Sequence, residues 1–273
     1  MLLLLPPSEV KATGGSGPPL GRRPQLSTPA LAASRAEMMA AIRRAARVDP
    51  AGLAAGLKLP DRLARAALNA NSAVATSPTM AALDRYAGVL YAALDVGGLS
   101  TAARRRAEDQ VVVFSGLWGA VRGGDALPDY RVPASGTVPG LGGVSAHWRA
   151  ALAAALPLLV GDLPVLDLRS GDYVSMWRPA VPLRDQVVSV RVLAERGTGA
   201  RRSVGPVSFH AKSVKGLVVR HLVTGRRAHR DPMTALSEVA GALGLRLTDT
   251  SSASGRSVDL IGPFTPLAGS TRP

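Results

Sequence analysis

Two polar clusters of the sequence carry side chains that could act as a nucleophile or as acid–base groups. Glu9 and Lys11 follow the apolar residues 1–5, and Asp167 lies near the end of the apolar residues 164–168. A lysine can lose its proton when it is buried and can then attack an electrophile, whereas an arginine cannot. A carboxylate can accept or donate the proton that such a reaction moves. The sequence therefore offers Lys11 as a candidate nucleophile, and Glu9 and Asp167 as candidate acid–base groups.

Another polar cluster follows the β-branched residues 111–114. Ser115 and Gly116 end this run, and the large aromatic side chain of Trp118 precedes a further glycine. The polar side chains that come next are Arg122, Asp125, Tyr130 and Arg131. A strand end, a glycine turn and polar side chains together are typical of a site. A buried tryptophan before a solvated loop would give the same pattern, so both interpretations stay open.

Each of these clusters stands at the end of a predicted strand, at residues 1–5, 111–114 and 164–168. Short apolar runs of this kind are typical of strands buried on both faces of a sheet. In an open α/β sheet, the groups that bind ligands lie beyond the carboxyl ends of the strands. If the three strands are parallel neighbours, we expect the clusters to meet at one edge of the sheet.

The rest of the pattern predicts an α/β or α+β protein in which helices surround a mixed sheet. Apolar residues at helical spacing and capping signals predict helices at residues 29–48, 61–68, 145–159, 211–224 and from Asp231-Pro232 to Gly244. Strand patterns predict a hairpin of residues 186–193 with 205–209, and a final strand at 245–248. We expect a single compact domain over residues 1–263 and a flexible tail over 264–273.

Residues 75–95 predict two short helices around a tight hairpin. Ser77 could cap a first helix that begins at Pro78, and Gly88 interrupts the apolar pattern before it resumes. This arrangement resembles a helix-hairpin-helix element, whose backbone amides can hold a DNA phosphate. Leu90 stands where that element usually has a second glycine. A helical hairpin that only packs against its neighbours is the alternative.

Several motifs, in chain order, resemble those of the YaaA family of peroxide stress proteins. They are residues 4–11 (LLPPSEVK), 86–91 (YAGVLY), the central Ser115-Gly116-Leu117-Trp118-Gly119 with Arg122, Asp125 and Tyr130-Arg131, residues 167–173 (DLRSGDY) and residues 209–220 (FHAKSVKGLVVR). Gly123 stands where the family usually has proline. The resemblance covers nearly the whole chain. It implies DNA binding, a role in limiting iron-dependent oxidative damage, and a distinctive fold that is not a Rossmann sheet.

The formal net charge of +14 also implies an anionic partner, for which nucleic acid is the first candidate. Only four of the 33 basic residues are lysines, so the coding bias of a GC-rich genome could account for part of the arginine content. Residues 196–230 contain nine Arg or Lys and no Asp or Glu. Such segregation predicts a positive surface at this segment.

The residues that we predict to contact DNA are polar, basic or glycine residues of the strand-end clusters, the hairpin and the basic segment: Ser8, Lys11, Gly88, Arg122, Arg131, Arg169, Tyr173, Lys212, Lys215 and Arg220. Binding should depend mainly on phosphates and therefore on salt. Stacking by Tyr173 or Trp118 would favour distorted or unpaired DNA.

Two other functions compete with DNA binding alone. A nucleic-acid-processing enzyme of the glycosylase or lyase type could use Lys11 with Glu9, and Asp167 with Asp172, so the question of enzymatic activity stays open. An iron-binding protein ranks last, because the positive charge repels cations and no ligand cluster is visible.

The composition limits the remaining classes. The absence of cysteine excludes disulfides, thiolate nucleophiles and cysteine-based metal sites. Residues 1–5 are too short for a signal peptide, and the apolar run 152–160 is too short to span a membrane. We expect a cytoplasmic protein with no membrane partner, no cofactor and no obligate metal. The sequence does not predict the oligomeric state.

Overall fold

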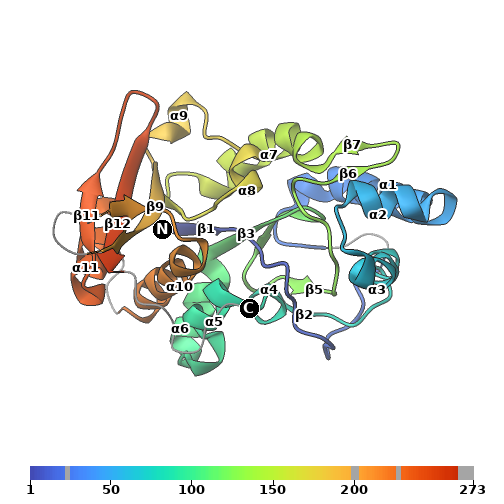
Figure 1. Cartoon of the computed structure of the whole chain (residues 1–273), viewed down its shortest axis with the longest axis horizontal. Helices are drawn as coiled ribbons and strands as arrows, with labels where there is room; N and C mark the ends of the chain where they lie inside the picture. Colours follow the sequence, from blue (N-terminus) through green and yellow to red (C-terminus); the bar gives the residue numbers. More distant parts are fainter. Residues whose placement is uncertain (22–24, 198–202, 226–228, 264–273) are drawn as a thin grey trace.

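A mixed sheet of eight strands runs through the middle of the protein, in the order β11-β12-β9-β8-β1-β3-β4 with β10 paired to β9. The computed structural model describes residues 1–21, 25–197, 203–225 and 229–263 (Figure 1). The strands of the sheet are β1 (Leu2–Leu5), β3 (Val111–Ser115), β4 (Gly119–Arg122), β8 (Val165–Asp167), β9 (Val187–Arg196), β10 (Ser203–Gly205), β11 (Arg246–Asp249) and β12 (Arg256–Pro263). Two small antiparallel pairs join β2 (Met80–Ala81) to β5 (Ala126–Leu127), and β6 (Thr137–Val138) to β7 (Gly142–Gly143). The predicted fold class is confirmed.

The centre of the sheet is parallel, which is the condition under which we expect the strand-end clusters to meet at one edge. Strand β1 pairs in parallel with β3 on one side, with Leu3 opposite Val111, and with β8 on the other, with Leu3 opposite Leu166. All four leucines of β1 and all five residues of β3 are buried. Long apolar side chains on both faces explain why these strands occupy the core. The carboxyl ends of β1, β3 and β8 therefore lie at the same edge.

Helices cover both faces of this sheet. Their bounds are η1 (Pro29–Leu31), α1 (Ala32–Val48), α2 (Pro50–Gly56), α3 (Asp61–Ser72), α4 (Ala82–Arg85), α5 (Val89–Leu94), η2 (Val96–Gly98), α6 (Thr101–Gln110), α7 (Val144–Val160), α8 (Asp172–Ser175), α9 (Val181–Arg184), α10 (Ser208–Thr224) and α11 (Pro232–Leu243). Figure 1 shows α5, α6 and α10 on one side of the central strands and α7 on the other, with α1, α2 and α3 grouped beyond the carboxyl ends of β1 and β3. The predicted helices 29–48, 61–68, 145–159, 211–224 and 232–243 are confirmed with small shifts of their ends.

The central motif forms a β-hairpin, because a strand that we did not predict, β4, follows the turn at Ser115-Gly116. Strand β4 pairs antiparallel with β3, with Ser115 opposite Gly119. Gly119 has a φ of 76°, and a side chain there would bring its Cβ within 2.6 Å of the Trp148 ring. Trp118 is 0% exposed, so its predicted role in base stacking is wrong. The packing interpretation of this tryptophan is the one that the structure supports.

The segment before Gly88 is also different from the prediction. No helix begins at Pro78; strand β2 follows it, and α4 is a single turn of four residues. The backbone of β2 instead pairs with β5, with Met80 opposite Leu127, and this pairing prevents the predicted helix. Helix α5 does follow Gly88, as expected. A helix-hairpin-helix element is therefore not established for residues 75–95.

The end of the sheet contains one more strand than we predicted. Strand β11 corresponds to the predicted strand 245–248, but it is not the final one, because β12 pairs in parallel with β9 over eight residues and antiparallel with β11. The predicted return strand 205–209 is shorter, since β10 ends at Gly205 and α10 begins at Ser208. The predicted tail 264–273 lies outside the described residues.

Candidate functional site

Two adjoining cavities open at the carboxyl ends of β1 and β8. The first, which we call the Lys11 cavity, has a volume of about 200 Å³, and the second, which we call the groove, has a volume of about 630 Å³. The residues that line both are Pro7, Ser8, Glu9, Pro133, Ser135 and Tyr173. The α2–α3 loop closes the Lys11 cavity with residues 57–60, while Gly88, α5 and the start of α10 line the groove. Segments far apart in the sequence thus share one hollow edge of the sheet.

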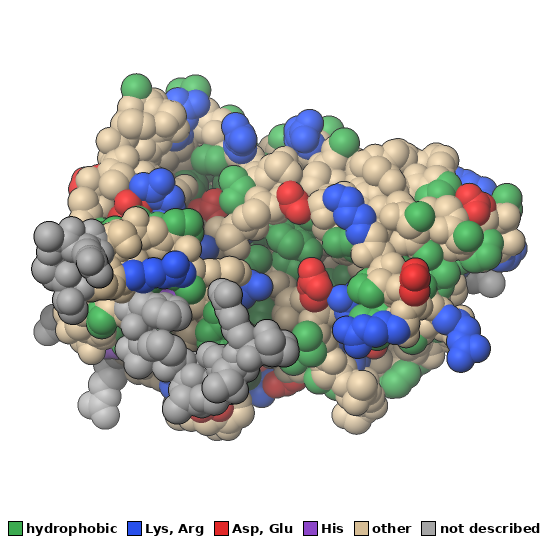
Figure 2. Space-filling model, viewed as in Figure 1, with side chains coloured by type: hydrophobic (Ala, Val, Ile, Leu, Met, Phe, Trp, Pro, Cys, Tyr) green, Lys and Arg blue, Asp and Glu red, His purple; other side chains and the backbone are tan. Residues whose placement is uncertain are grey.

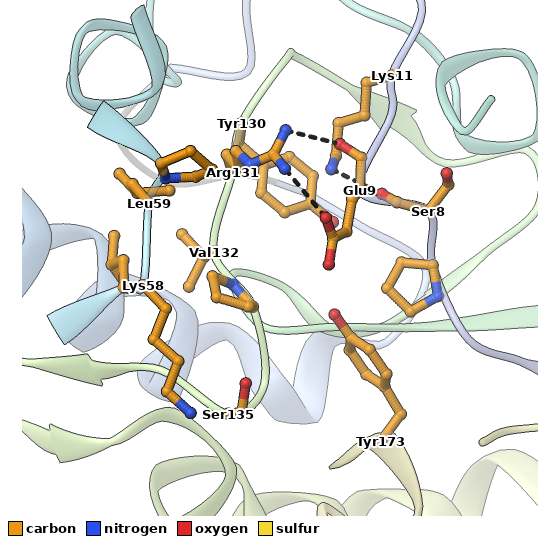
Figure 3. A pocket seen from close by; sticks show the side chains of 14 residues that line it. Ser8, Glu9, Lys11, Lys58, Leu59, Tyr130, Arg131, Val132, Ser135 and Tyr173 are labelled. Atoms are coloured by element: carbon orange, nitrogen blue, oxygen red, sulfur yellow. Dashed lines mark hydrogen bonds and ion pairs between the residues drawn. The ribbon is translucent and has the colours of Figure 1, made fainter. Parts of the chain in front are cut away.

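Lys11 extends from the loop after β1 toward the side chain of Tyr130 (Figure 3). Its Nζ donates a hydrogen bond of 3.0 Å to the carbonyl oxygen of Ser8 and lies 4.3 Å from the centroid of the Tyr130 ring. Burial of the amine lowers the pKa of Lys11 to about 8, which outweighs the opposite effect of the nearby Asp129 carboxylate. A fraction of these amines is therefore uncharged near neutral pH.

A chain of buried hydroxyl groups lies behind the Tyr130 ring. The Tyr130 hydroxyl lies 2.7 Å from that of Tyr86 and 2.6 Å from Oγ of Ser115. Oγ of Ser115 also accepts hydrogen bonds from the amides of Leu117 and Trp118. Burial raises the pKa of Tyr130 well above its ordinary value, so the phenol stays protonated. The hydroxyl of Ser115 thus joins the central hairpin to the wall of the Lys11 cavity.

Arg131 and Glu9 form an ion pair at the exposed side of this cavity. One guanidinium nitrogen of Arg131 donates to a carboxylate oxygen of Glu9 at 3.0 Å (Figure 3). The backbone of Arg131 is held by the buried side chain of Asn71, whose amide donates to the Arg131 carbonyl at 2.9 Å and accepts from its N–H at 2.7 Å. We did not predict Asn71, because an asparagine in the alanine-rich α3 carries no signal for a partner 60 residues away.

Two further residues complete the lining. Tyr173, at the start of α8, lines both cavities, and burial raises its pKa to about 12. Lys58, which is exposed, lines the Lys11 cavity from the α2–α3 loop. We did not single out Lys58, although the rarity of lysine in this chain was a signal that could have identified it. The cavity wall therefore contains two lysines from opposite sides.

The groove lies between the turn at Gly88, which precedes α5, and the first turns of α10. Gly88 has a φ of 103°, and a Cβ there would lie 2.8 Å from Oγ of Ser8, so both its conformation and its neighbour require glycine. Lys212 is exposed and lines the groove, and Phe209, which follows the lining residue Ser208 in the chain, is 48% exposed. Asp172 adds a carboxylate to the same lining. The lining of the groove is therefore mixed in charge.

The structure buries three of the predicted site residues. The Asp167 carboxylate binds the guanidinium of Arg169 with hydrogen bonds of 2.8 and 2.6 Å, and both side chains are nearly inaccessible. Nζ of Lys215 donates to the carbonyl oxygens of Leu168 at 2.7 Å and Arg169 at 3.1 Å. Burial also lowers the pKa of Lys215 to about 8. These groups stabilise the end of β8 and present no free charge to a ligand.

Two other predicted residues lie away from both cavities. Arg122 donates to the carbonyl oxygen of Asp109 at the end of α6. Arg220 donates to the carbonyl oxygens of Leu94 and Asp95 at 2.9 and 2.7 Å, and so holds α10 against the end of α5. The predicted site residues that the structure brings together are Ser8, Glu9, Lys11, Gly88, Arg131, Tyr173 and Lys212.

Comparison with known proteins confirms the family that the sequence motifs indicate. A family model described as peroxide stress protein YaaA matches residues 1–241. The chain belongs to the YaaA family. A UPF0246 protein of Streptomyces coelicolor is 41% identical over 232 residues, which are 85% of this chain and 86% of the relative. UPF0246 proteins of Corynebacterium efficiens and Corynebacterium glutamicum are 36% and 35% identical over 231 and 247 residues, covering 83% and 88% of this chain and 86% and 93% of the relatives.

Some residues of the motifs that resemble the YaaA family lie at the Lys11 cavity, and others stabilise the fold. Glu9, Lys11, Ser115 and Tyr130 surround the Lys11 cavity or its hydroxyl chain. Asp125 instead stabilises the fold, because its carboxylate accepts from the amides of Ser27 and Arg122 at 2.9 Å. Among the described residues, no group of three or more His, Asp or Glu side chains is placed to hold a metal ion, and no helix is both long and apolar enough to cross a membrane.

Proposed function

We propose that this YaaA-family protein binds DNA in the response to peroxide stress, with one strand lying along the groove and its phosphates contacting Lys212 and Arg131. The observation that carries this proposal is the position of the two adjoining cavities. They lie at the sheet edge where strand-end polar groups, the glycine turn before α5 and the start of α10 with the exposed Lys212 come together. Backbone amides and cationic side chains are the groups that position a protein on a phosphate backbone.

The charges of the lining support an anionic ligand. Four cationic side chains line the two cavities, against the carboxylates of Glu9 and Asp172: Lys11, Lys58, Arg131 and Lys212. Figure 2 shows Lys and Arg side chains (blue) around a central hollow that also contains hydrophobic (green) and acidic (red) side chains. The whole chain carries a net charge of +14, which attracts a polyanion from a distance.

The aromatic side chains near the groove favour unpaired or distorted DNA. Tyr173 lines both cavities, and the exposed ring of Phe209 lies on the first turn of α10 beside the groove residue Ser208. A base that is not stacked in a duplex can stack on such a ring, with a contribution of about 1–3 kcal/mol per base. In the helices that the structure describes beside the groove, we find no set of side chains suited to reading base edges in a major groove, so we propose contacts mainly to phosphate and to exposed bases.

The test is a titration of duplex, bubble and single-stranded DNA at several salt concentrations. The wild-type protein should bind more weakly as salt rises, and Lys212→Ala should reduce the slope of log K against log salt by about 1. Arg47→Ala, which removes an exposed arginine of α1 that lines neither cavity, is the matched control and should change the affinity much less. An affinity that does not depend on salt, or that falls equally in both variants, would overturn the proposal.

A further inference from the structure

Lys11 has an environment that differs from that of a lysine in a surface ion pair. Its Nζ donates to the carbonyl oxygen of Ser8, and within the described part of the chain no carboxylate oxygen lies within 4.0 Å of it. The carboxylate of Glu9, which lines the same cavity, is instead bound to Arg131. The amine therefore faces a cavity without a counterion in direct contact, as an amine nucleophile requires.

We propose that Lys11 forms an imine with the aldehyde of an abasic deoxyribose in DNA and promotes cleavage of the strand by β-elimination. This inference rests on the proposed DNA binding, because the groove would hold the strand on either side of the abasic sugar. The substrate class follows from the chemistry of the cavity: a primary amine, a carboxylate and a guanidinium line a space that adjoins the larger groove.

The size of the cavity agrees with a sugar that has lost its base. Its volume of about 200 Å³ is below the roughly 300–1,000 Å³ of pockets that enclose a drug-sized molecule. A complete purine nucleoside would need more space than a deoxyribose alone. An abasic site also costs less to rotate out of a duplex, because no base pair has to be broken.

The surroundings of Nζ stabilise the protonated imine as well as the free amine. A protonated imine carries a positive charge and one N–H group. This N–H can donate a hydrogen bond to the carbonyl oxygen of Ser8. The face of the Tyr130 ring, with its centroid 4.3 Å from Nζ, attracts that positive charge. Because burial lowers the pKa of Lys11 to about 8, about a tenth of the amines are uncharged at pH 7 and can attack.

The reaction balances without an oxidant or a reductant. The uncharged amine attacks C1′ of the open-chain sugar, a C–N bond forms, and the aldehyde oxygen leaves as water after protonation, which gives the protonated imine. A base then removes a proton from C2′, and we assign this role to the Glu9 carboxylate of the cavity lining. The C3′–O bond breaks, and its electron pair leaves with the phosphate of the downstream strand. Water finally hydrolyses the unsaturated imine and releases the amine of Lys11.

Reductive trapping tests this inference directly. The full-length protein is incubated with a duplex that contains one abasic site, in the presence of sodium cyanoborohydride, and the covalent adduct is located by peptide mass mapping. The expected result is an adduct on Lys11 and a loss of at least 100-fold in trapping by Lys11→Arg, which keeps the positive charge. Arg47→Ala, which lines neither cavity, is the control and should give the Lys11 adduct at the level of the wild type.

Other outcomes of the same experiment are equally informative. An adduct on Lys58, on the N-terminal amine of Met1 or on another lysine would overturn the inference, as would the absence of any adduct while the protein binds the same duplex. In that second case the proposed DNA binding would stand. If the protein does not bind DNA, deoxyribose 5-phosphate replaces the duplex as the trapped aldehyde. An adduct of this small aldehyde on Lys11 would then support the nucleophile although the proposed function had failed, and no adduct would end both proposals.

Discussion

Arg131 and Glu9, which are 122 positions apart in the chain, form an ion pair of 3.0 Å at the exposed side of the Lys11 cavity. This pair neutralises a cation that a phosphate would otherwise bind. Glu9→Gln should therefore strengthen DNA binding by about threefold at low salt, in line with the ~0.2–1 kcal/mol of an exposed pair. The same variant should slow any cleavage of abasic DNA, because it removes the proposed base. Filter binding and strand cleavage on one substrate measure both effects, and weaker binding by Glu9→Gln would contradict the phosphate-binding role of Arg131.

The second prediction concerns the hydrogen bonds between Asn71 and the backbone of Arg131. Asn71→Asp places a buried carboxylate oxygen against the Arg131 carbonyl, where an amide nitrogen donates at 2.9 Å. The loss of that bond and the burial of a charge should lower the free energy of unfolding by about 3 kcal/mol. Asn69→Asp, an exposed position of the same helix, is the control and should change it by less than about 0.5 kcal/mol. Urea denaturation compares the two, and equal stabilities would contradict the role assigned to Asn71.

The third prediction separates a structural from a chemical role of Asp167. Its carboxylate is the counterion of the buried Arg169 guanidinium, at 2.6 Å. Asp167→Asn leaves that charge without compensation and should cost about 3–5 kcal/mol of stability. Asp172→Asn, at an exposed position of the groove, should leave stability nearly unchanged. Thermal unfolding of the two variants is the measurement; an Asp167→Asn protein as stable as wild type would restore Asp167 as a candidate for chemistry.

The fourth prediction concerns the contact between α10 and α5. A Cβ on Gly216 would clash with the carbonyl oxygen of Leu90 and lie 2.8 Å from Cβ of Ala93. Alanine gains about 1 kcal/mol of helix propensity over glycine, but overpacking of this kind costs about 1–3 kcal/mol or more, so the clash dominates. Gly216→Ala should therefore be destabilising. Gly241→Ala in α11 has open space around it and should instead stabilise the protein by about 0.5–1 kcal/mol. Opposite signs in chemical denaturation are the expected result, and equal signs would contradict it.

The fifth prediction is a dependence of stability on pH. Burial lowers the pKa of Lys215 to about 8, below the ordinary value of 10.5 that the unfolded chain restores. Between these values the unfolded state binds more protons than the folded state, so the free energy of unfolding should rise as the pH increases from about 8 to 10, by up to about 3 kcal/mol. Lys215→Met should lose this contribution, and the rise that remains should come from Lys11, whose pKa burial also lowers to about 8. Lys212→Met, an exposed lysine one turn earlier, should keep the contribution of Lys215. A wild-type stability that falls over this range would contradict the burial of an uncharged amine.

The centre of the sheet and part of the site could be predicted because short segments of the sequence indicate them. The leucines of β1 and the valines of β3 predict buried strands. Polar residues that follow the ends of such strands lie at the same edge of the sheet if the strands are parallel neighbours. Lys11, Glu9 and Tyr173 were identified in this way. The strand β12 could not be predicted in this way, because it is defined by its pairing with β9, about 70 positions earlier in the chain.

The predictions that failed concern the partners of charged side chains. Arg169 and Lys215 look like surface cations in the sequence, but the first has a buried carboxylate partner and the second donates to two backbone carbonyl oxygens. Arg220 likewise holds the end of α5 rather than a ligand. A charged residue near a strand end is therefore a site candidate only until its partners are known, and those partners come from distant parts of the chain.

Strand β1 comes more than a hundred residues before β3 and β8 in the chain, yet it lies between them, and their pairing residues begin at Val111 and Val165. During synthesis its four leucines have no strand to pair with until more than a hundred further residues have emerged. A nascent chain must keep this apolar segment from aggregating for most of translation, and folding governed by such distant contacts is slow. We therefore expect the yield of folded protein to depend on chaperones that hold the β1 segment during synthesis.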